Sequence, residues 1–304
     1  MVFEWPFWFV VAETCDVVEC WFVEKFARYK GKDLPLERIV QLKDSLTREI
    51  ADFTVTFVLD QRVAGSGTLL RAGNNFGILT ATHVAELFTG RNAKSVGLVI
   101  SQHKHQFVLS PDYLIPIKIF DCTVISPDAG PDMTFLRIVK PDDEANIVRF
   151  KSAYRLEGRS FGQFSGVPIG ELPWWIAGAP AEMSASDGER GTSSHVLTAL
   201  QWVGEATMVS IDSLSDFDLV RLRISAGQHN FPLDYGGVSG GGIWVSAFAI
   251  DPEKGFETIS YDPPFLAGVA FYQSASSEGE RIIVGHGPSS IYDGVLSRLK
   301  KEHG

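Results

Sequence analysis

The chain has 304 residues, of which 45% are hydrophobic and 21% charged, and its formal net charge is −10. This composition is ordinary for a globular protein, and the length indicates about two domains. The negative charge disfavours nonspecific binding to nucleic acids and to anionic membranes, because both depend on Lys and Arg. No stretch reaches the roughly 18 continuous apolar residues of a membrane-spanning helix, so we expect no membrane span.

Residues 1–50 differ in pattern from the remainder. The apolar N-terminus lacks a basic segment and contains Glu4, which is untypical of a signal peptide. Apolar residues between Leu36 and Leu46 have the spacing of one helical face, and Asp33 precedes them as a candidate cap. These features predict an N-terminal helical extension. Three roles stay open for it: packing on the other part of the chain, occluding a cleft, or binding a regulatory partner.

From Phe53 onward the pattern becomes strand-like, with alternating apolar residues and Gly-rich turns. The charged segment from Pro141 to about Gly158 predicts a strand-poor connector. A second set of short strands follows between residues 160 and 285, and residues 289–300 predict a closing helix with basic residues near its end. Within that second set, Trp174-Trp175 indicates a buried strand, with a ligand platform as the alternative.

The cysteines are Cys15, Cys20 and Cys122. At most one disulfide can form among three cysteines, whereas small secreted proteins are usually rich in disulfides. We therefore expect a cytoplasmic protein that is stabilised by its hydrophobic core.

The residues with the clearest chemical meaning surround Ser239, which lies in the run Gly236-Gly237-Val238-Ser239-Gly240. Glycines allow positive φ angles, so successive N–H groups can point toward one place. A serine on such a turn can attack a carbonyl carbon while nearby amides bind the developing negative charge. Taken alone, the pattern is also typical of a turn without chemistry.

Two upstream segments supply matching partners. His83 ends the apolar run that begins at Gly77, and Asp132 precedes the alternating segment 134–138. A histidine can take the serine proton, and an aspartate can orient the imidazole. Other aspartates compete with Asp132 for this role; they are Asp112, Asp121 and Asp128.

With these segments the chain resembles the trypsin-like (chymotrypsin-fold) serine peptidases, in their bacterial type. Residues 79–83 (Leu-Thr-Ala-Thr-His) are similar to the family's histidine motif, residues 132–136 to its aspartate motif, and residues 237–241 (Gly-Val-Ser-Gly-Gly) to its serine motif. The resemblance implies an all-β fold of two six-stranded antiparallel β-barrels. The first barrel is expected over 51–155 and the second over 156–288, with the N-terminal extension before them and a C-terminal helix over 289–304.

The resemblance further implies a serine endopeptidase that cuts peptides or proteins without a cofactor or metal. Ser239 would be the nucleophile, His83 the base and Asp132 its orienting partner, while the N–H groups of Gly237 and Ser239 would form the oxyanion hole. Val238 departs from the family pattern, because animal digestive members carry there an aspartate that binds a newly cut N-terminus. Phe271 stands about where many members have a serine that supports the aspartate.

The same register places Leu233 at the base of the primary substrate pocket, with Tyr272 and Gln273 near its wall. An apolar base predicts small or apolar substrate side chains, because a buried cation would lack a counter-charge. A shift of one residue would put Asp234 there instead and reverse this expectation.

Two alternatives to a peptidase stay open: a binding module on the same fold, inactive or activated by a partner, and an esterase. His103 and His105 could form a metal pair, but no nearby carboxylate or cysteine completes a ligand set, so a solvated strand is expected.

Overall fold

The computed structural model describes residues 28–29, 32–33, 36–59, 62–89, 96–100, 105–122, 125–161, 170, 172–186, 197–198, 201–228, 231–251 and 255–302. The chain divides into two compact units, Met1–Lys43 and Asp44–Gly304. In the first unit the structure describes a short antiparallel pair, β1 (Arg28–Tyr29) and β2 (Lys32–Asp33), and the beginning of α2 (Leu36–Phe53). The helix that the sequence predicts after Asp33 is therefore present.

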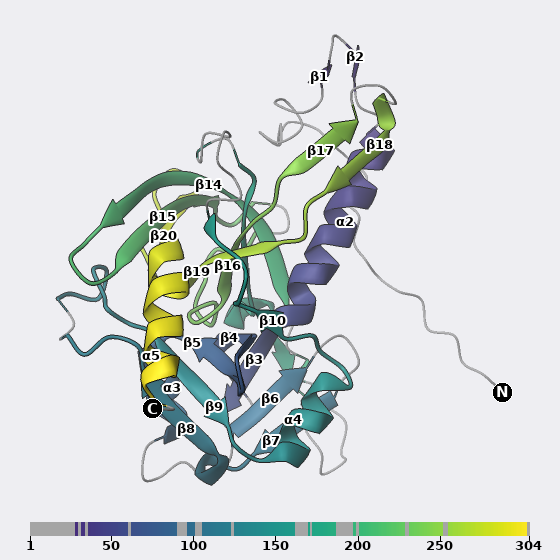
Figure 1. Cartoon of the computed structure of the whole chain (residues 1–304). Helices are drawn as coiled ribbons and strands as arrows, with labels where there is room; N and C mark the ends of the chain where they lie inside the picture. The colour runs from purple at the N-terminus through teal and green to yellow at the C-terminus, as the bar shows by residue number, and fades with distance from the viewer. Residues whose placement is uncertain are drawn as a thin grey trace. The chain divides into compact units, whose positions relative to one another are not determined.

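The first half of the large unit is an eight-stranded sheet (Figure 1). Seven strands pair in antiparallel order: β7 (His105–Leu109), β6 (Val96–Ile100), β3 (Thr54–Leu59), β4 (Arg62–Ala72), β5 (Asn75–Thr80), β9 (Thr134–Ile138) and β8 (Leu114–Lys118). The eighth, β10 (Tyr154–Arg155), pairs with β4 in parallel. The short helix α3 (Thr82–Thr89) begins two residues after β5, and α4 (Pro141–Val148) follows β9.

The second half is a closed antiparallel barrel of six strands. Its order is β11 (Trp174–Gly178), β14 (Trp202–Ser213), β15 (Asp218–Ser225), β20 (Glu280–His286), β19 (Phe265–Gln273) and β16 (Gly242–Val245). The one-turn helix η4 (Ala181–Met183) follows β11, and a π-helical turn η5 (Ser290–Val295) continues into α5 (Leu296–Lys301). Two small strand pairs complete the described elements: β12 (Ala185–Ser186) with β13 (Leu197–Thr198), and β17 (Phe248–Asp251) with β18 (Gly255–Tyr261).

Apolar side chains from both halves meet in one shared core. Because successive strand residues face opposite sides, Trp174 enters the barrel interior while its neighbour Trp175 packs in a cluster with Leu79 and Phe135 of the sheet. Trp244 of β16 belongs to the same shared cluster and is fully buried. Trp174 and Trp175 are therefore core residues, and the ligand-platform alternative is wrong.

The predicted all-β class with a terminal helix is confirmed, with several local differences. The first strand set forms an open sheet, in which β7 and β8 do not pair with each other. The segment expected to be a strand-poor connector contains only the two-residue strand β10, and it also forms helix α4, because Pro141 and the three acidic residues after it suit a helix N-terminus. Helix α2 continues to Phe53, past the domain limit expected at residue 50. Most of the strand expected at 160–165, and the His103 side of the histidine pair, lie outside the described residues.

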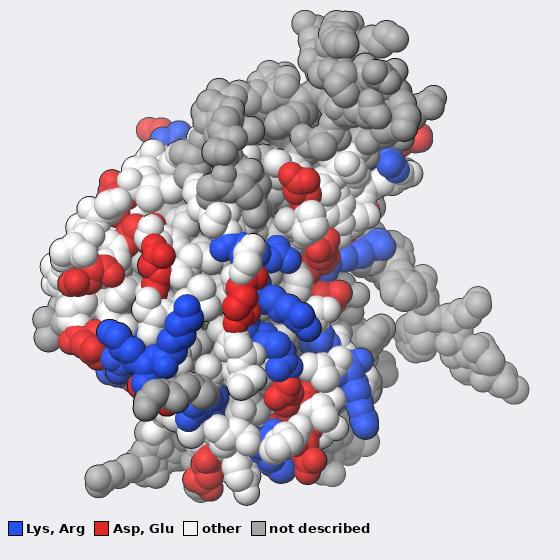
Figure 2. Space-filling view, in the orientation of Figure 1, with Lys and Arg blue, Asp and Glu red and all other residues white. Residues whose placement is uncertain are grey.

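Among the described helices, none combines the length and apolar character needed to cross a membrane. On the face shown in Figure 2, Lys and Arg side chains lie interspersed with Asp and Glu side chains. The described part of this face thus shows mixed charge rather than a broad field of one sign.

Candidate active site

Ser239 lies on a glycine-rich turn immediately before β16. Gly237 and Gly240 have φ angles of +92° and +88°, a region that other residues rarely adopt. A Cβ atom at Gly240 would lie 2.0 Å from the Thr80 hydroxyl and 2.1 Å from the Ser66 carbonyl oxygen. The turn therefore requires glycine at this position, because Ser239 approaches the first sheet so closely.

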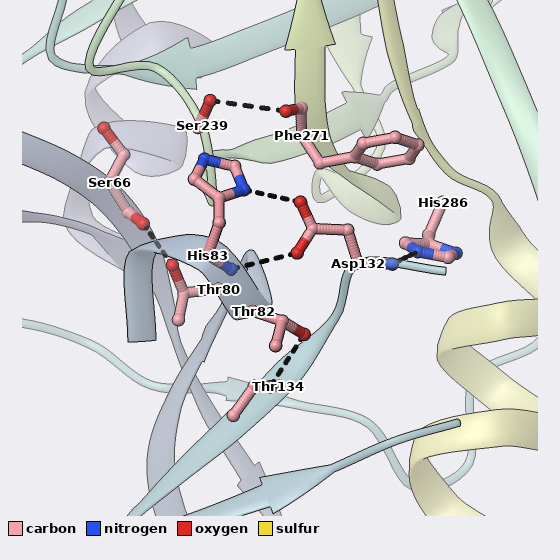
Figure 3. Close-up of polar contacts among 9 residues, drawn as sticks. All are labelled: Ser66, Thr80, Thr82, His83, Asp132, Thr134, Ser239, Phe271 and His286. Carbon is pink, nitrogen blue, oxygen red and sulfur yellow. Dashed lines mark hydrogen bonds and ion pairs between the residues drawn. The ribbon is translucent and has the colours of Figure 1, made fainter. Parts of the chain in front are cut away.

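Ser66 of β4 anchors the serine turn to the first sheet. Its N–H donates to the Ser239 carbonyl (2.8 Å), and its hydroxyl donates to the Gly237 carbonyl (2.7 Å). The same hydroxyl accepts from the Ala179 N–H (2.9 Å), and the Thr80 hydroxyl donates to the Ser66 carbonyl (2.7 Å; Figure 3). Ser66 and Thr80 are fully buried. Sequence reasoning assigned no role to either residue.

The N–H groups expected to form the oxyanion hole are those of Gly237 and Ser239. Neither Gly237 nor Ser239 donates its N–H to an acceptor in the described part of the chain, whereas Val238 donates to the Tyr235 carbonyl (3.0 Å). Two free amides on one turn, separated by a single residue, are suitable donors for a developing oxyanion.

His83 is the second residue of α3, and two hydrogen bonds join it to Asp132. Its Nδ1 lies 2.5 Å from Asp132 Oδ2, and its backbone N–H donates to Asp132 Oδ1 (3.0 Å; Figure 3). The His83 side chain is 50% exposed and that of Asp132 is 16% exposed. Next to His83, the hydroxyl groups of Thr82 and Thr134 hydrogen bond to each other (2.9 Å), which ties α3 to β9.

The electrostatics of Asp132 favour the ionised carboxylate. Burial opposes its charge, but the hydrogen bond and charge of His83, together with the N–H groups of His83 and Thr82, outweigh burial and hold the pKa of Asp132 below its usual range. The competing aspartates have other partners: Asp121 pairs with Arg298, and Asp112 and Asp128 hydrogen bond to nearby serines. Asp132 is therefore the expected aspartate that meets His83.

The serine hydroxyl is turned away from the histidine. Ser239 Oγ donates to the Phe271 carbonyl at 3.5 Å, and no hydrogen bond joins Ser239 Oγ to His83 among the described residues (Figure 3). Phe271 and Tyr272 line both the hollow that contains Ser239 and the one that contains His83. The structure thus brings His83 and Asp132 into contact, and it leaves the expected Ser239–His83 bond unmade.

His286 supports Asp132 and was missed at the sequence level. Its Nε2 accepts the Asp132 N–H (2.9 Å), so a neutral ring carries its proton on Nδ1, which has no hydrogen-bond partner among the described residues. Burial lowers the pKa of His286 to about 3. Phe120, Phe217 and Phe271 surround the ring with centroids at 5.2, 5.4 and 5.1 Å. The signal in the sequence was a lone histidine ending an apolar strand, a feature more often structural.

The predicted pocket base at Leu233 is wrong. Leu233 is 57% exposed, and it is not among the residues that line the hollow beside Ser239. Asp234 is also exposed, so the alternative register places no charge inside either. Tyr272 and Gln273 line this hollow together with buried Tyr235. The free volume is about 10 Å³, room for roughly one water molecule.

A larger hollow, of about 380 Å³, lies on the His83 side. Apolar groups dominate its wall, and the lining includes Phe120, Pro127, Pro131, Met133, Phe271 and Tyr272 beside His83 and Asp132. The exposed ion pair of Lys118 with Glu86 (3.1 Å) and the thiol of Cys122 complete it. Space for a bulky side chain thus exists next to the imidazole rather than beside the serine.

No protein-family model matches the chain, and no curated protein matches it. Solved structures that it resembles are serine peptidases. One is neuropsin, a serine protease expressed in the limbic system of mouse brain (TM-score 0.48, 16% identity, 84% of this chain and 96% of that chain). Another is kallikrein-related peptidase 10 (TM-score 0.47, 12% identity, 83% of this chain and 95% of that chain). At these identities the likeness concerns the fold alone.

Proposed function

We propose that this protein is a serine endopeptidase in which His83, Asp132 and Ser239 form the catalytic triad. The observation that carries the proposal is the His83–Asp132 pair, whose Nδ1–Oδ2 separation is 2.5 Å and whose second bond fixes the histidine backbone. A carboxylate bound at Nδ1 leaves Nε2 as the nitrogen that can accept a proton.

In the proposed reaction, Ser239 Oγ rotates from the Phe271 carbonyl toward His83 and attacks the scissile carbonyl carbon. Its proton passes to His83 Nε2, and the oxyanion accepts hydrogen bonds from the N–H groups of Gly237 and Ser239. His83 then protonates the leaving amine as the C–N bond breaks, which leaves an acyl-enzyme. Water, deprotonated by His83, attacks the ester carbon, and the proton returns to Ser239 as the acid leaves. Asp132 stabilises the transient imidazolium.

The substrate follows from the two hollows. A free volume of about 10 Å³ beside Ser239 suits glycine or alanine at the bond to be cut, and the larger hollow beside His83 suits a bulky apolar side chain. We therefore propose a substrate with a small residue at the cut and an apolar residue nearby. The low cysteine content supports a cytoplasmic location as part of this proposal.

Labelling with a fluorophosphonate probe tests the chemistry directly. We expect the wild type to be labelled and Ser239→Ala to be unlabelled, and we expect His83→Ala to react at least about 10²-fold more slowly, since a positioned base contributes about 10²–10⁴. A panel of peptides that differ at the cut residue separates a peptidase from an esterase. Efficient cleavage after Arg or Lys would contradict the proposed specificity.

A second candidate is a binding module on the same fold. The observation in its favour is the Ser239 hydroxyl, which donates to the Phe271 carbonyl, makes no hydrogen bond to His83 among the described residues and lies next to a hollow with little free volume. Wild-type protein that binds peptides but never reacts with the probe at Ser239 would favour this module.

A further inference from the structure

Side chains hold the segment before the serine turn, residues 233–236, by accepting hydrogen bonds from its backbone N–H groups. Glu182 of η4 reaches this segment with both carboxylate oxygens: Oε1 accepts the Leu233 N–H (2.5 Å) and Oε2 accepts the Asp234 N–H (3.1 Å). Glu182 is exposed, so burial of its side chain does not explain its position. A charged acceptor that takes two neighbouring amides restricts the orientation of both peptide planes.

The next two amides are held in the same manner. The Tyr235 N–H donates to Gln273 Oε1 (2.9 Å), and the Gly236 N–H donates to Asp234 Oδ1 (2.9 Å). Gln273 Nε2 also donates to Asp234 Oδ1 (2.5 Å), which joins the two acceptors. Four consecutive N–H groups, from residue 233 to residue 236, are therefore bound by side chains, whereas the Gly237 N–H after them is free.

The η4 turn also fixes the peptide that carries this free N–H. The Ala181 N–H donates to the Gly236 carbonyl at 2.7 Å. In a planar trans peptide the carbonyl of one residue and the N–H of the next point in opposite directions. Holding the Gly236 carbonyl toward Ala181 thus aims the Gly237 N–H away from η4. If this single peptide flipped, its carbonyl would replace the donor of the oxyanion hole.

The residue directly before Ser239 offers no polar alternative. Val238 is apolar and buried, so its side chain forms no hydrogen bond to the preceding peptides. Arg281 adds a contact at the start of the segment, where its Nε donates to the Leu233 carbonyl (2.7 Å).

We infer that Glu182 is a positioning residue which, with the Ala181 N–H, holds the peptide between residues 236 and 237 in the orientation that builds the oxyanion hole. This inference rests on the proposed peptidase function for its catalytic consequence. The structural part of the inference is that the shape of this turn depends on the exposed carboxylate of Glu182. This part does not depend on whether the protein is a peptidase.

Hydrogen exchange of the full chain, followed by mass spectrometry over residues 231–241, tests the structural content. In Glu182→Ala we expect the amides of Leu233 and Asp234, which lose their acceptor, to exchange at least about tenfold faster, and the amides of residues 235 and 236 to exchange faster by a smaller factor as the turn loosens. Glu182→Gln keeps one acceptor oxygen and should show a smaller increase. Glu157→Ala is the matched control, because Glu157 is also exposed and its carboxylate also accepts a backbone N–H, that of Gly73.

The rate of probe labelling at Ser239 tests the catalytic consequence. We expect Glu182→Ala to lose about 10–10³-fold, up to the full value of one oxyanion donor, with peptide KM little changed and kcat reduced. Unchanged exchange over residues 233–236 in Glu182→Ala overturns the inference, as does faster exchange with an unaltered labelling rate. If the wild type itself is never labelled, the proposed function fails, and exchange alone then decides whether Glu182 fixes the turn.

Discussion

Replacing Ser66 by alanine removes the hydroxyl through which β4 holds the serine turn. That hydroxyl donates to the Gly237 carbonyl at 2.7 Å and accepts the Ala179 N–H at 2.9 Å. The side chain is fully buried, and so is Ala179. A missing oxygen atom leaves too little space for water to replace it, so both backbone groups lose their partners.

The expected cost follows from these two groups. An unsatisfied buried backbone group costs about 1–3 kcal/mol, so Ser66→Ala should lower the free energy of unfolding by about 2–6 kcal/mol. That is a large share of the roughly 5–15 kcal/mol that stabilises a typical domain. Labelling of Ser239 should fall as well, because the Gly237 carbonyl belongs to the turn that presents the free amides.

Urea unfolding gives the measurement, with Ser246→Ala as the matched control. Ser246 is equally buried, but its hydroxyl makes one bond, to the carbonyl of exposed Asp262 (2.8 Å), so its loss should cost about 0.5–1.5 kcal/mol. A Ser66→Ala variant no less stable than Ser246→Ala would refute the idea that Ser66 is the bridge between sheet and turn.

Three further outcomes are expected. His286→Phe keeps the aromatic packing but removes the acceptor of the Asp132 N–H, so probe labelling of Ser239 should slow by more than about tenfold. Far-ultraviolet circular dichroism should stay unchanged. Labelling at the wild-type rate would exclude a positioning role for His286. Folding lowers the pKa of Asp132, so its ionised form stabilises the protein at neutral pH, and that contribution disappears as the pH falls below about 4. The difference in unfolding free energy between wild type and Asp132→Asn should therefore shrink as the pH is lowered from about 5 to about 3. Burial lowers the pKa of Lys151 from 10.5 to about 8, so between pH 8 and pH 10.5 the unfolded chain keeps a proton that the folded chain releases. The free energy of unfolding measured in urea should therefore rise with pH in this window for the wild type, and rise less for Lys151→Met.

The sequence indicates the candidate site residues more clearly than it indicates the residues that support them. His83, Asp132 and Ser239 each lie in a short local sequence pattern. Gly240 belongs to the serine pattern, and it is glycine because the backbone of Ser66 lies too close for a side chain. Ser66 and His286 act through contacts with segments far away in the chain, and nothing in their own neighbourhood distinguishes them from ordinary strand residues.

Helices were harder to predict than strands for a similar reason. The segment that starts α3 at Thr82 continues directly from β5, and its apolar residues suit either a strand or a short helix until Thr134 and Asp132 bind its first turn. The pocket error has the same origin: counting six residues back from Ser239 fixes a position along the chain but not the direction in which Leu233 points.

Because β4 supplies the partners of Ser239 and Gly237, the fragment that contains the nucleophile is incomplete when expressed alone. A break in the exposed stretch after β10 would leave two pieces that share the core around Trp175 and Leu79. Neither piece should react with the probe by itself, and mixing them should restore labelling as they reassemble. The chain therefore offers a split reporter whose signal depends on two polypeptides finding each other.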